Sequence, residues 1–286
     1  MQLGLYAQIA CIWEATAHKP GNVHRFRDFE DASYVDFLVS AAALAPVLQM
    51  APGQRVGATV LEAIRATRTT VSTNTNLGIV LLLAPLAAVP GHRDLRASLE
   101  EILKRLDVDD ARMVYEAIRL AAPGGLGRAP QQDLSQEPTV SLQEAMLLAA
   151  DRDLVACQYA NGFREVLDEG VPSLRRTLAE SKPMEEAIIV CHLELMANHP
   201  DSLIARKRGI AEAEESAMRA RSVIDAGWPD TQAGRNALSK LDSWLRAEGH
   251  ARNPGATADL VAASLFAALR QGIIKLPAAW QPLLLS

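Results

Sequence analysis

Cysteine, aromatic residues and long apolar runs are all scarce in this sequence of 286 residues. The three cysteines, Cys11, Cys157 and Cys191, are far apart and form no Cys-x-x-Cys pair, which excludes a zinc ribbon or a disulfide framework. We expect them to be small buried hydrophobes in a reducing compartment. The longest apolar run, residues 77–89, is shorter than the roughly 20 residues of a membrane-spanning helix. Since no basic leader opens the chain either, we expect a soluble, cytoplasmic protein without a membrane partner.

The motifs of three large enzyme classes are also absent. The chain has no Gly-x-Ser-x-Gly, no His-Glu-x-x-His and no Gly-x-x-x-x-Gly-Lys-[Ser/Thr] pattern, which argues against serine hydrolases, zincins and P-loop NTPases. The formal net charge is −5, which argues against a nucleic-acid partner bound through a broad basic surface. A small nucleotide needs only a local cluster of Arg and Lys, so nucleotide substrates stay open.

What the sequence does contain favours helices. Apolar residues make up 49% of the chain, enough for a substantial core. Ala and Leu dominate this fraction, whereas alternating strand patterns and Asn-Gly or Asp-Gly hairpins are missing. Helical spacing is strong over residues 184–198 and 237–245. We therefore predict an all-α fold in which residues 1–286 form a single compact domain of about ten or more helices.

Two further helices are predicted from their start signals. Ser141 is followed three residues later by Glu144, which is a capping-box pattern, and apolar residues recur every four positions over residues 142–154. This spacing predicts one helix with one apolar stripe. The last strong helix is predicted over residues 257–271, with Thr257 as its N-cap.

The first segment that could carry chemistry is HKPGNVHR at residues 18–25. Pro-Gly sets a turn, and the flanking basic and imidazole groups with exposed backbone N–H groups could bind a phosphate. Asp28, Glu30 and Asp31 follow, and such carboxylates could hold Mg²⁺. The alternative is a solvated turn before a helix that starts near Ala32.

The second segment is TNTNLG at residues 73–78, directly before the longest apolar run. One Asn or Thr suffices to cap a buried helix, so four in a row are an excess. A helix N-terminus that presents free N–H groups to an anion would explain this excess. A cap alone and a cap combined with a ligand site are both open.

Two further segments combine charge with turn residues. Asp201 is followed by Arg-Lys-Arg-Gly at residues 206–209, which would suit a polyphosphate or simply form a solvated helix face. Residues 253–259 read NPGATAD and lead into the last helix. Asp259 would lie in its first turn, where a negative charge interacts favourably with the helix dipole without any further function. A glycine-rich loop at residues 124–128 is a weaker candidate.

In their order along the chain, these four motifs resemble the triphosphoribosyl-dephospho-CoA synthase family. The motifs are KPGNVHR (19–25), TNTNLG (73–78), the stretch 201–209, and NPGATADL (253–260). The resemblance spans nearly the whole chain and implies an all-helical enzyme. It also implies that ATP donates its 5-triphosphoribosyl group to the 2′-hydroxyl of 3′-dephospho-CoA while adenine leaves.

The resemblance further implies roles for individual residues. It assigns phosphate binding to Lys19, Arg25, Arg206 and Arg208. It assigns metal binding or the catalytic base to Asp28, Asp31 and Asp259. Asn74, Asn76 and Asn253 would orient ribose or purine, and Gly21, Asn22, His24 and Gly255 complete the expected substrate site. Mg²⁺ is the expected cofactor, ATP is a substrate, and a homodimer is compatible with this reading. Glu14 could be structural or part of the site, and we expect a helix-end acid.

Within the second of these motifs, the sequence departs from the family at two positions. Family members that act in lyase maturation resemble VNTHKG where this chain has TNTNLG, so Asn76 and Leu77 replace a His and a Lys. In these positions the chain resembles more closely the branch found in archaea and in bacteria with methanopterin-linked one-carbon chemistry. Two alternatives therefore stay open: a related pentosyl or phosphoribosyl transferase in methanopterin-type cofactor biosynthesis, and a helical nucleotide-binding protein without catalysis.

Overall fold

The computed structural model describes residues 2–122, 132–278 and 280. The glycine-rich loop at residues 124–128 lies outside these ranges. The described residues form fourteen α-helices and one short π-helical segment, and they contain no strand. The predicted all-α fold of ten or more helices is thereby confirmed. The elements are α1 (Leu3–Thr16), α2 (Tyr34–Gln49), α3 (Val56–Arg68), α4 (Leu77–Ala88), α5 (Leu95–Leu103), α6 (Val108–Ala121), α7 (Leu142–Leu147), α8 (Leu154–Asn161), η1 (Glu165–Gly170), α9 (Val171–Ala179), α10 (Met184–Asn198), α11 (Ser202–Arg208), α12 (Ile210–Asp225), α13 (Gln232–Arg246) and α14 (Gly255–Arg270).

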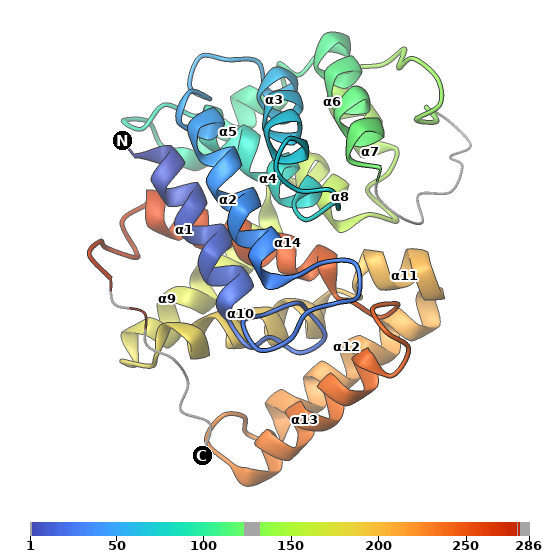
Figure 1. Cartoon of the computed structure of the whole chain (residues 1–286). Helices are drawn as coiled ribbons and strands as arrows, with labels where there is room; N and C mark the ends of the chain where they lie inside the picture. Colours follow the sequence, from blue (N-terminus) through green and yellow to red (C-terminus); the bar gives the residue numbers. More distant parts are fainter. Residues whose placement is uncertain (1, 123–131, 279, 281–286) are drawn as a thin grey trace.

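Two helices form the centre of the molecule. Nearly every residue of α4 and α14 is buried, as expected for helices that are apolar on all sides. α14 crosses the centre and contacts α1, α4, α9 and α10 (Figure 1). At its C-terminal end, Arg270 donates to the backbone oxygens of Leu86, Val89 and Pro90, where α4 ends. These bonds satisfy carbonyls that the end of α4 leaves without a helical partner.

A second, smaller hydrophobic cluster lies beside this core. It joins α10 and α11 to the antiparallel pair α12 and α13, which forms one end of the molecule (Figure 1). Ile204 of α11 and Leu245 of α13 are buried in this cluster. The arrangement matters for the site, because α13 contacts the loop that follows α1 and α11 contacts α14.

One predicted capping box and one predicted helix are confirmed in detail, whereas another predicted helix is wrong. Ser141 and Glu144 form the predicted capping box, and α10 covers the predicted residues 184–198. The single helix predicted over residues 142–154 is instead two helices, because α7 ends at Leu147 and α8 starts at Leu154. The carboxylate of Asp153 accepts hydrogen bonds from the backbone N–H groups of two residues at the start of α8, so a new N-cap interrupts the stripe.

The predicted start of the last helix is also corrected. α14 starts at Gly255, and Thr257 is not its N-cap. The backbone N–H and the hydroxyl of Thr257 both donate to Asp201 Oδ2, at 2.7 and 2.8 Å. Asp259 consequently lies beyond the first turn of α14. The carboxylate at the N-cap of α11 thus also accepts hydrogen bonds at the N-terminus of α14, which links two segments of the predicted site.

The structure also describes the longest apolar helices and the three cysteines. Among the described residues, no helix is long and apolar enough to cross a membrane. Cys11 and Cys191 are buried and Cys157 is half-buried, and all three are free thiols.

Candidate active site

A cavity of about 530 Å³ opens where four segments that are far apart in the sequence meet. They are the loop after α1, the loop before α4, helix α11, and the start of α14 with the loop before it. Small-molecule sites in proteins typically measure roughly 300–1,000 Å³, so the volume suits a small ligand. Of the residues predicted to form a site, the cavity is lined by Asn22, Asp31, Asn74, Asn76, Arg206, Asn253, Gly255 and Asp259.

Helix α13 holds the loop that follows α1 in place. Gly21 has a φ of +77°, and a Cβ at this position would lie 2.7 Å from Leu245 Cδ1, so the turn requires glycine. The Gly21 N–H donates to Asp242 Oδ1 at 2.8 Å. Arg246 donates to the backbone oxygen of Asn22 at 2.6 Å. The Pro-Gly turn is therefore fixed by tertiary contacts, and it presents Asn22 to the cavity.

Asn22 connects the first predicted segment to the fourth. Its Nδ2 donates to Asn253 Oδ1 at 2.7 Å and to the backbone oxygen of Pro254 at 3.4 Å. Its Oδ1 is buried and accepts no hydrogen bond within the described part of the chain. The two asparagines thus form one side of the cavity.

Asp201 positions α11 against α14. It is fully buried and accepts hydrogen bonds from the backbone N–H groups of Leu203 and Ile204 at 2.8 and 3.1 Å, in addition to the two bonds from Thr257. Burial raises the pKa of Asp201, and these hydrogen bonds oppose that shift. The arrangement fixes the start of α11, from which Arg206 and Lys207 reach the cavity.

The Asn- and Thr-rich segment before α4 performs several structural tasks. Asn74 Oδ1 accepts a hydrogen bond at 3.2 Å from the N–H of Leu77, the first residue of α4, while Asn76 occupies the N-cap position. Asn76 Nδ2 donates to Thr67 Oγ1 at 3.0 Å, and Thr75 Oγ1 lies 2.6 Å from the hydroxyl of Ser40. Three of the four polar residues therefore have structural partners, which accounts for much of the excess noted in the sequence. All four also line the cavity.

Asp259 is the most unusual acid of the cavity. A Cβ built on Gly78 would lie 2.0 Å from Asp259 Oδ2, so the carboxyl group packs directly on the first turn of α4. Asp259 forms no hydrogen bond or ion pair with any residue the structure describes. Burial and the negative charges of Glu14, Asp201 and Asp153 raise its pKa well above the ordinary value, and Arg206 opposes the shift. This environment favours a protonated acid that can donate a proton.

Carboxylates outnumber cations around the cavity. Among the described residues, the cavity is lined by the acids Glu14, Asp31, Asp153 and Asp259 and by two basic side chains of Arg or Lys, Arg206 and Lys207. Carboxylate oxygens are the protein ligands that Mg²⁺ prefers, and Mg²⁺ commonly accompanies a bound polyphosphate. The donor set therefore fits a Mg²⁺–polyphosphate complex better than a free polyanion.

Three of these residues were not assigned to the site from sequence. Glu14, near the end of α1, was expected to be a helix-end acid; it pairs with Lys19 at 2.8 Å and also lines the cavity. Asp153 lies 3.5 Å from Arg206, measured from Oδ2 to Nη1. Its position inside a predicted continuous helix concealed it. Lys207 lies between Arg206 and Arg208, and the order of these basic residues in the sequence does not show which of them line the cavity.

Several predicted residues lie outside the cavity lining. Lys19 is fully buried, and its ammonium group is held by Glu14. His24 is also buried, and burial, together with the nearby His18, lowers its pKa to about 2. Arg25 forms a bidentate ion pair with Glu185, at 2.6 and 2.9 Å. These residues brace the inner side of the loop after α1.

Two charged residues of the prediction lie on other surfaces. Asp28 accepts a hydrogen bond from the Tyr34 N–H at 2.6 Å, at the start of α2. Arg208 pairs with Glu212 and Glu248, each at 2.9 Å, on the outer side of α11. Neither residue lines the cavity in this structure.

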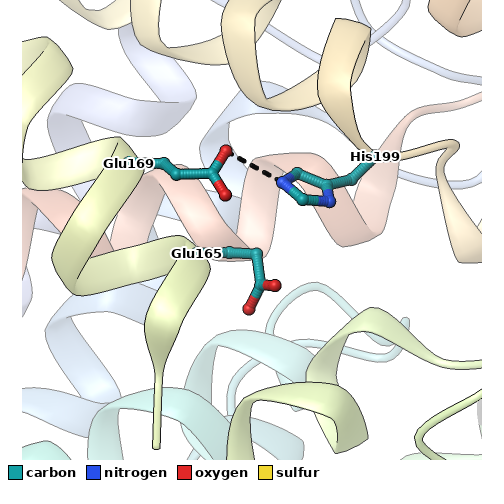
Figure 2. A group of neighbouring side chains, drawn as sticks. All are labelled: Glu165, Glu169 and His199. Atoms are coloured by element: carbon teal, nitrogen blue, oxygen red, sulfur yellow. Dashed lines mark hydrogen bonds and ion pairs between the residues drawn. The ribbon is translucent and has the colours of Figure 1, made fainter. Parts of the chain in front are cut away.

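A separate group of metal-ligating side chains lies elsewhere. Glu165, Glu169 and His199 place one ligand atom each within 4.8 Å of one another (Figure 2). His199 Nε2 lies 2.9 Å from Glu169 Oε2, and Figure 2 shows these two side chains facing each other. The Glu165 carboxylate already accepts hydrogen bonds from Gln158, Asn161 and Arg164. Contacts within the protein thus account for the group.

The sequence matches the profile of one protein family. The family is described as CitG, ATP:dephospho-CoA triphosphoribosyl transferase, and the match covers residues 1–276. All four segments that border the cavity lie within the matched region.

Individual relatives carry corresponding names. A protein of Pseudomonas fluorescens strain Pf-5, named as a 2-(5″-triphosphoribosyl)-3′-dephosphocoenzyme-A synthase, is 36% identical over 104 residues, which are 36% of this chain and 35% of that protein. An Azotobacter vinelandii protein named in the same way is 28% identical over 228 residues, 79% of this chain and 76% of the relative. The alignment with the first relative thus spans about a third of its length.

A solved structure is also similar. The crystal structure of an Archaeoglobus fulgidus protein, named as a triphosphoribosyl-dephospho-CoA synthase, superposes with a TM-score of 0.63 at 27% sequence identity. The superposition covers 82% of this chain and 99% of that chain. The similarity therefore extends through most of the helical fold.

Proposed function

Because the chain belongs to the ATP:dephospho-CoA triphosphoribosyl transferase family, we propose that it transfers the 5-triphosphoribosyl group of ATP to the 2′-hydroxyl of 3′-dephospho-CoA and releases adenine. One observation carries the proposal: the four sequence segments that resemble this family converge on a single cavity, although more than 200 residues separate the first from the last. A helical scaffold alone does not require this convergence of polar loops.

The reaction breaks the bond between ribose C1 and adenine and forms a bond from C1 to the acceptor oxygen. The bonding electrons leave with adenine, which must gain a proton, and the acceptor hydroxyl must lose one. Asp259 is suited to the first task, because burial and neighbouring acids favour its protonated form. It then accepts the hydroxyl proton directly or through water, which restores the acid for the next turnover.

The triphosphate is assigned to the α11 side of the cavity. Arg206 reaches the cavity there, and a guanidinium group can bind two phosphate oxygens at once. Asp31 and Asp153 are the residues that would hold Mg²⁺, and the ion would neutralise phosphate charge. Asn22, Asn74 and Asn253 supply amide groups for ribose or purine, of which the buried Asn22 Oδ1 lacks a donor within the described protein.

Free adenine is the most direct product to measure. We expect adenine to appear on chromatography when the protein is mixed with ATP, Mg²⁺ and 3′-dephospho-CoA, and not when the acceptor is omitted. Coenzyme A is a matched control acceptor, because it differs by a phosphate next to the reacting hydroxyl. The Asp259→Asn protein should release adenine at least about 100-fold more slowly, as expected for loss of a general acid.

Other outcomes would redirect the assignment. Adenine release with a pterin-type acceptor but not with dephospho-CoA would identify a sibling pentosyl transferase. Stabilisation by ATP without any turnover would identify a nucleotide-binding protein. Either result would contradict the proposed reaction.

A further inference from the structure

Lys207 lines a largely acidic cavity and has no partner among the residues that the structure describes. It is half-buried, lines the cavity, and forms no ion pair or hydrogen bond with any residue in the described ranges. The residues outside those ranges include no Asp or Glu. Its neighbours in the sequence differ, because Arg206 lies near Asp153 and Arg208 is held by Glu212 and Glu248.

The position of Lys207 is fixed from the start of its helix. Asp201 caps α11 through two backbone N–H groups and ties it to Thr257 of α14. Because α11 has only seven residues, this anchor sets the direction of its last turn. Arg206 and Lys207 consequently face the cavity while Arg208 faces away.

A half-buried ammonium group without a counter-charge among the described residues is energetically unfavourable. Burial lowers the pKa of Lys207; Asp31 and Asp201 oppose this shift, while the positive charge of Arg206 adds to it. A cation in the last turn of α11 could simply stabilise the negative end of the helix dipole. That effect does not explain why Lys207 is half-buried, because Arg208 in the same turn is exposed and paired. A bound anion would supply the missing counter-charge.

We propose that Lys207 binds the triphosphate of the nucleoside triphosphate substrate, next to Arg206, and thereby makes recognition depend on the β- and γ-phosphates. The inference rests on the proposed function for the location of the nucleotide. It assigns to Lys207 the phosphate contact that the sequence had suggested for Arg208.

The test compares nucleotides that differ only in their phosphates. Calorimetric titration with ATP, ADP and AMP in the presence of Mg²⁺ would be performed on the wild-type protein and on Lys207→Met, which keeps the length of the side chain but removes its charge. ATP binding should weaken about tenfold or more in this variant, and AMP binding should change by less than about twofold. Lys207→Arg should retain most of the affinity for ATP. Lys240→Met, on the exposed side of α13, is the matched control and should bind like the wild type.

Thermal unfolding excludes a trivial loss of structure. Since Lys207 has no partner in the described protein, the melting temperature of Lys207→Met should equal or exceed that of the wild type. Unchanged ATP affinity in Lys207→Met, or equal losses for ATP and AMP, would overturn the inference. Binding does not require turnover. A wild-type protein that discriminates ATP from AMP but releases no adenine would therefore contradict the proposed reaction and leave the Lys207 inference standing.

Discussion

The Gly78→Ala substitution should slow catalysis with little effect on the stability of the fold. The added Cβ would lie 2.0 Å from Asp259 Oδ2, whereas real Cβ atoms essentially never approach another heavy atom within 3.0 Å. The carboxyl group must therefore retreat by about 1 Å, the difference between these two distances. A displacement of this size in a catalytic group can cost about 100-fold in rate. We expect kcat for adenine release to fall by roughly that factor, with little change in KM for ATP.

Stability should respond weakly to the same substitution. Replacing Gly by Ala in a helix gains up to about 1 kcal/mol, and the overlapping atom is the end of a movable side chain. The free energy of unfolding should change by less than about 1 kcal/mol, which corresponds to a melting temperature within about 3 °C of the wild type.

A second glycine in a helix provides the matched control. At Gly57 of α3, a Cβ would lie 2.7 Å from the Cα and the backbone oxygen of Asp110, and backbone atoms cannot rotate away. Gly57→Ala should lose about 1–3 kcal/mol of stability while the folded protein keeps its kcat. The reasoning about Asp259 would be refuted if Gly78→Ala kept full activity, or if it lost activity only in proportion to lost folded protein.

Three further predictions concern the charged residues around the cavity. Asp201→Ala removes the acceptor for four donors of α11 and α14 and should destabilise the protein by about 2–4 kcal/mol in chemical denaturation; a loss below about 1 kcal/mol would contradict its anchoring role. Because the pKa of Asp259 is raised in the folded protein, folding must return a proton to this carboxylate at any pH between the unfolded-state and folded-state pKa values. The free energy of unfolding therefore falls as the pH rises through this interval. Asp259→Asn should therefore raise the melting temperature at neutral pH and flatten the dependence of stability on pH, and kcat of the wild type should fall as the pH rises through the pKa of Asp259; identical pH profiles in the two proteins would refute the assignment. Arg206→Met should weaken ATP binding about tenfold, and unchanged affinity would exclude a phosphate contact.

Much of the fold could be predicted because its signals are local. The capping box of Ser141 and Glu144 and the apolar spacing of α10 are properties of a few neighbouring residues. The boundary between α7 and α8 was missed because Asp153 caps a new helix although the apolar spacing continues through it. Thr257 was misread for a different reason: its donors are used by Asp201, which is distant in the sequence.

In the site, too, local patterns could be predicted from the sequence, whereas contacts between distant residues could not. The four segments could be identified from their residues, because Gly, Pro and Asn cluster there without need in a plain helical bundle. Which side chains face the cavity depends on tertiary contacts. Lys19 forms a buried ion pair with Glu14 of the preceding helix and does not line the cavity. Lys207 lines the cavity because Asp201 fixes the start of its helix. The contact between Gly78 and Asp259 joins residues that no local pattern relates.

The central claim is that the cavity between these four segments holds the reacting nucleotide. A crystal structure of the Asp259→Asn protein with ATP, Mg²⁺ and 3′-dephospho-CoA tests it most directly. We predict that the triphosphate lies against Arg206 and Lys207 and that the bond between ribose and adenine lies beside residue 259. Nucleotide density outside the cavity, or a triphosphate placed away from α11, would contradict the account.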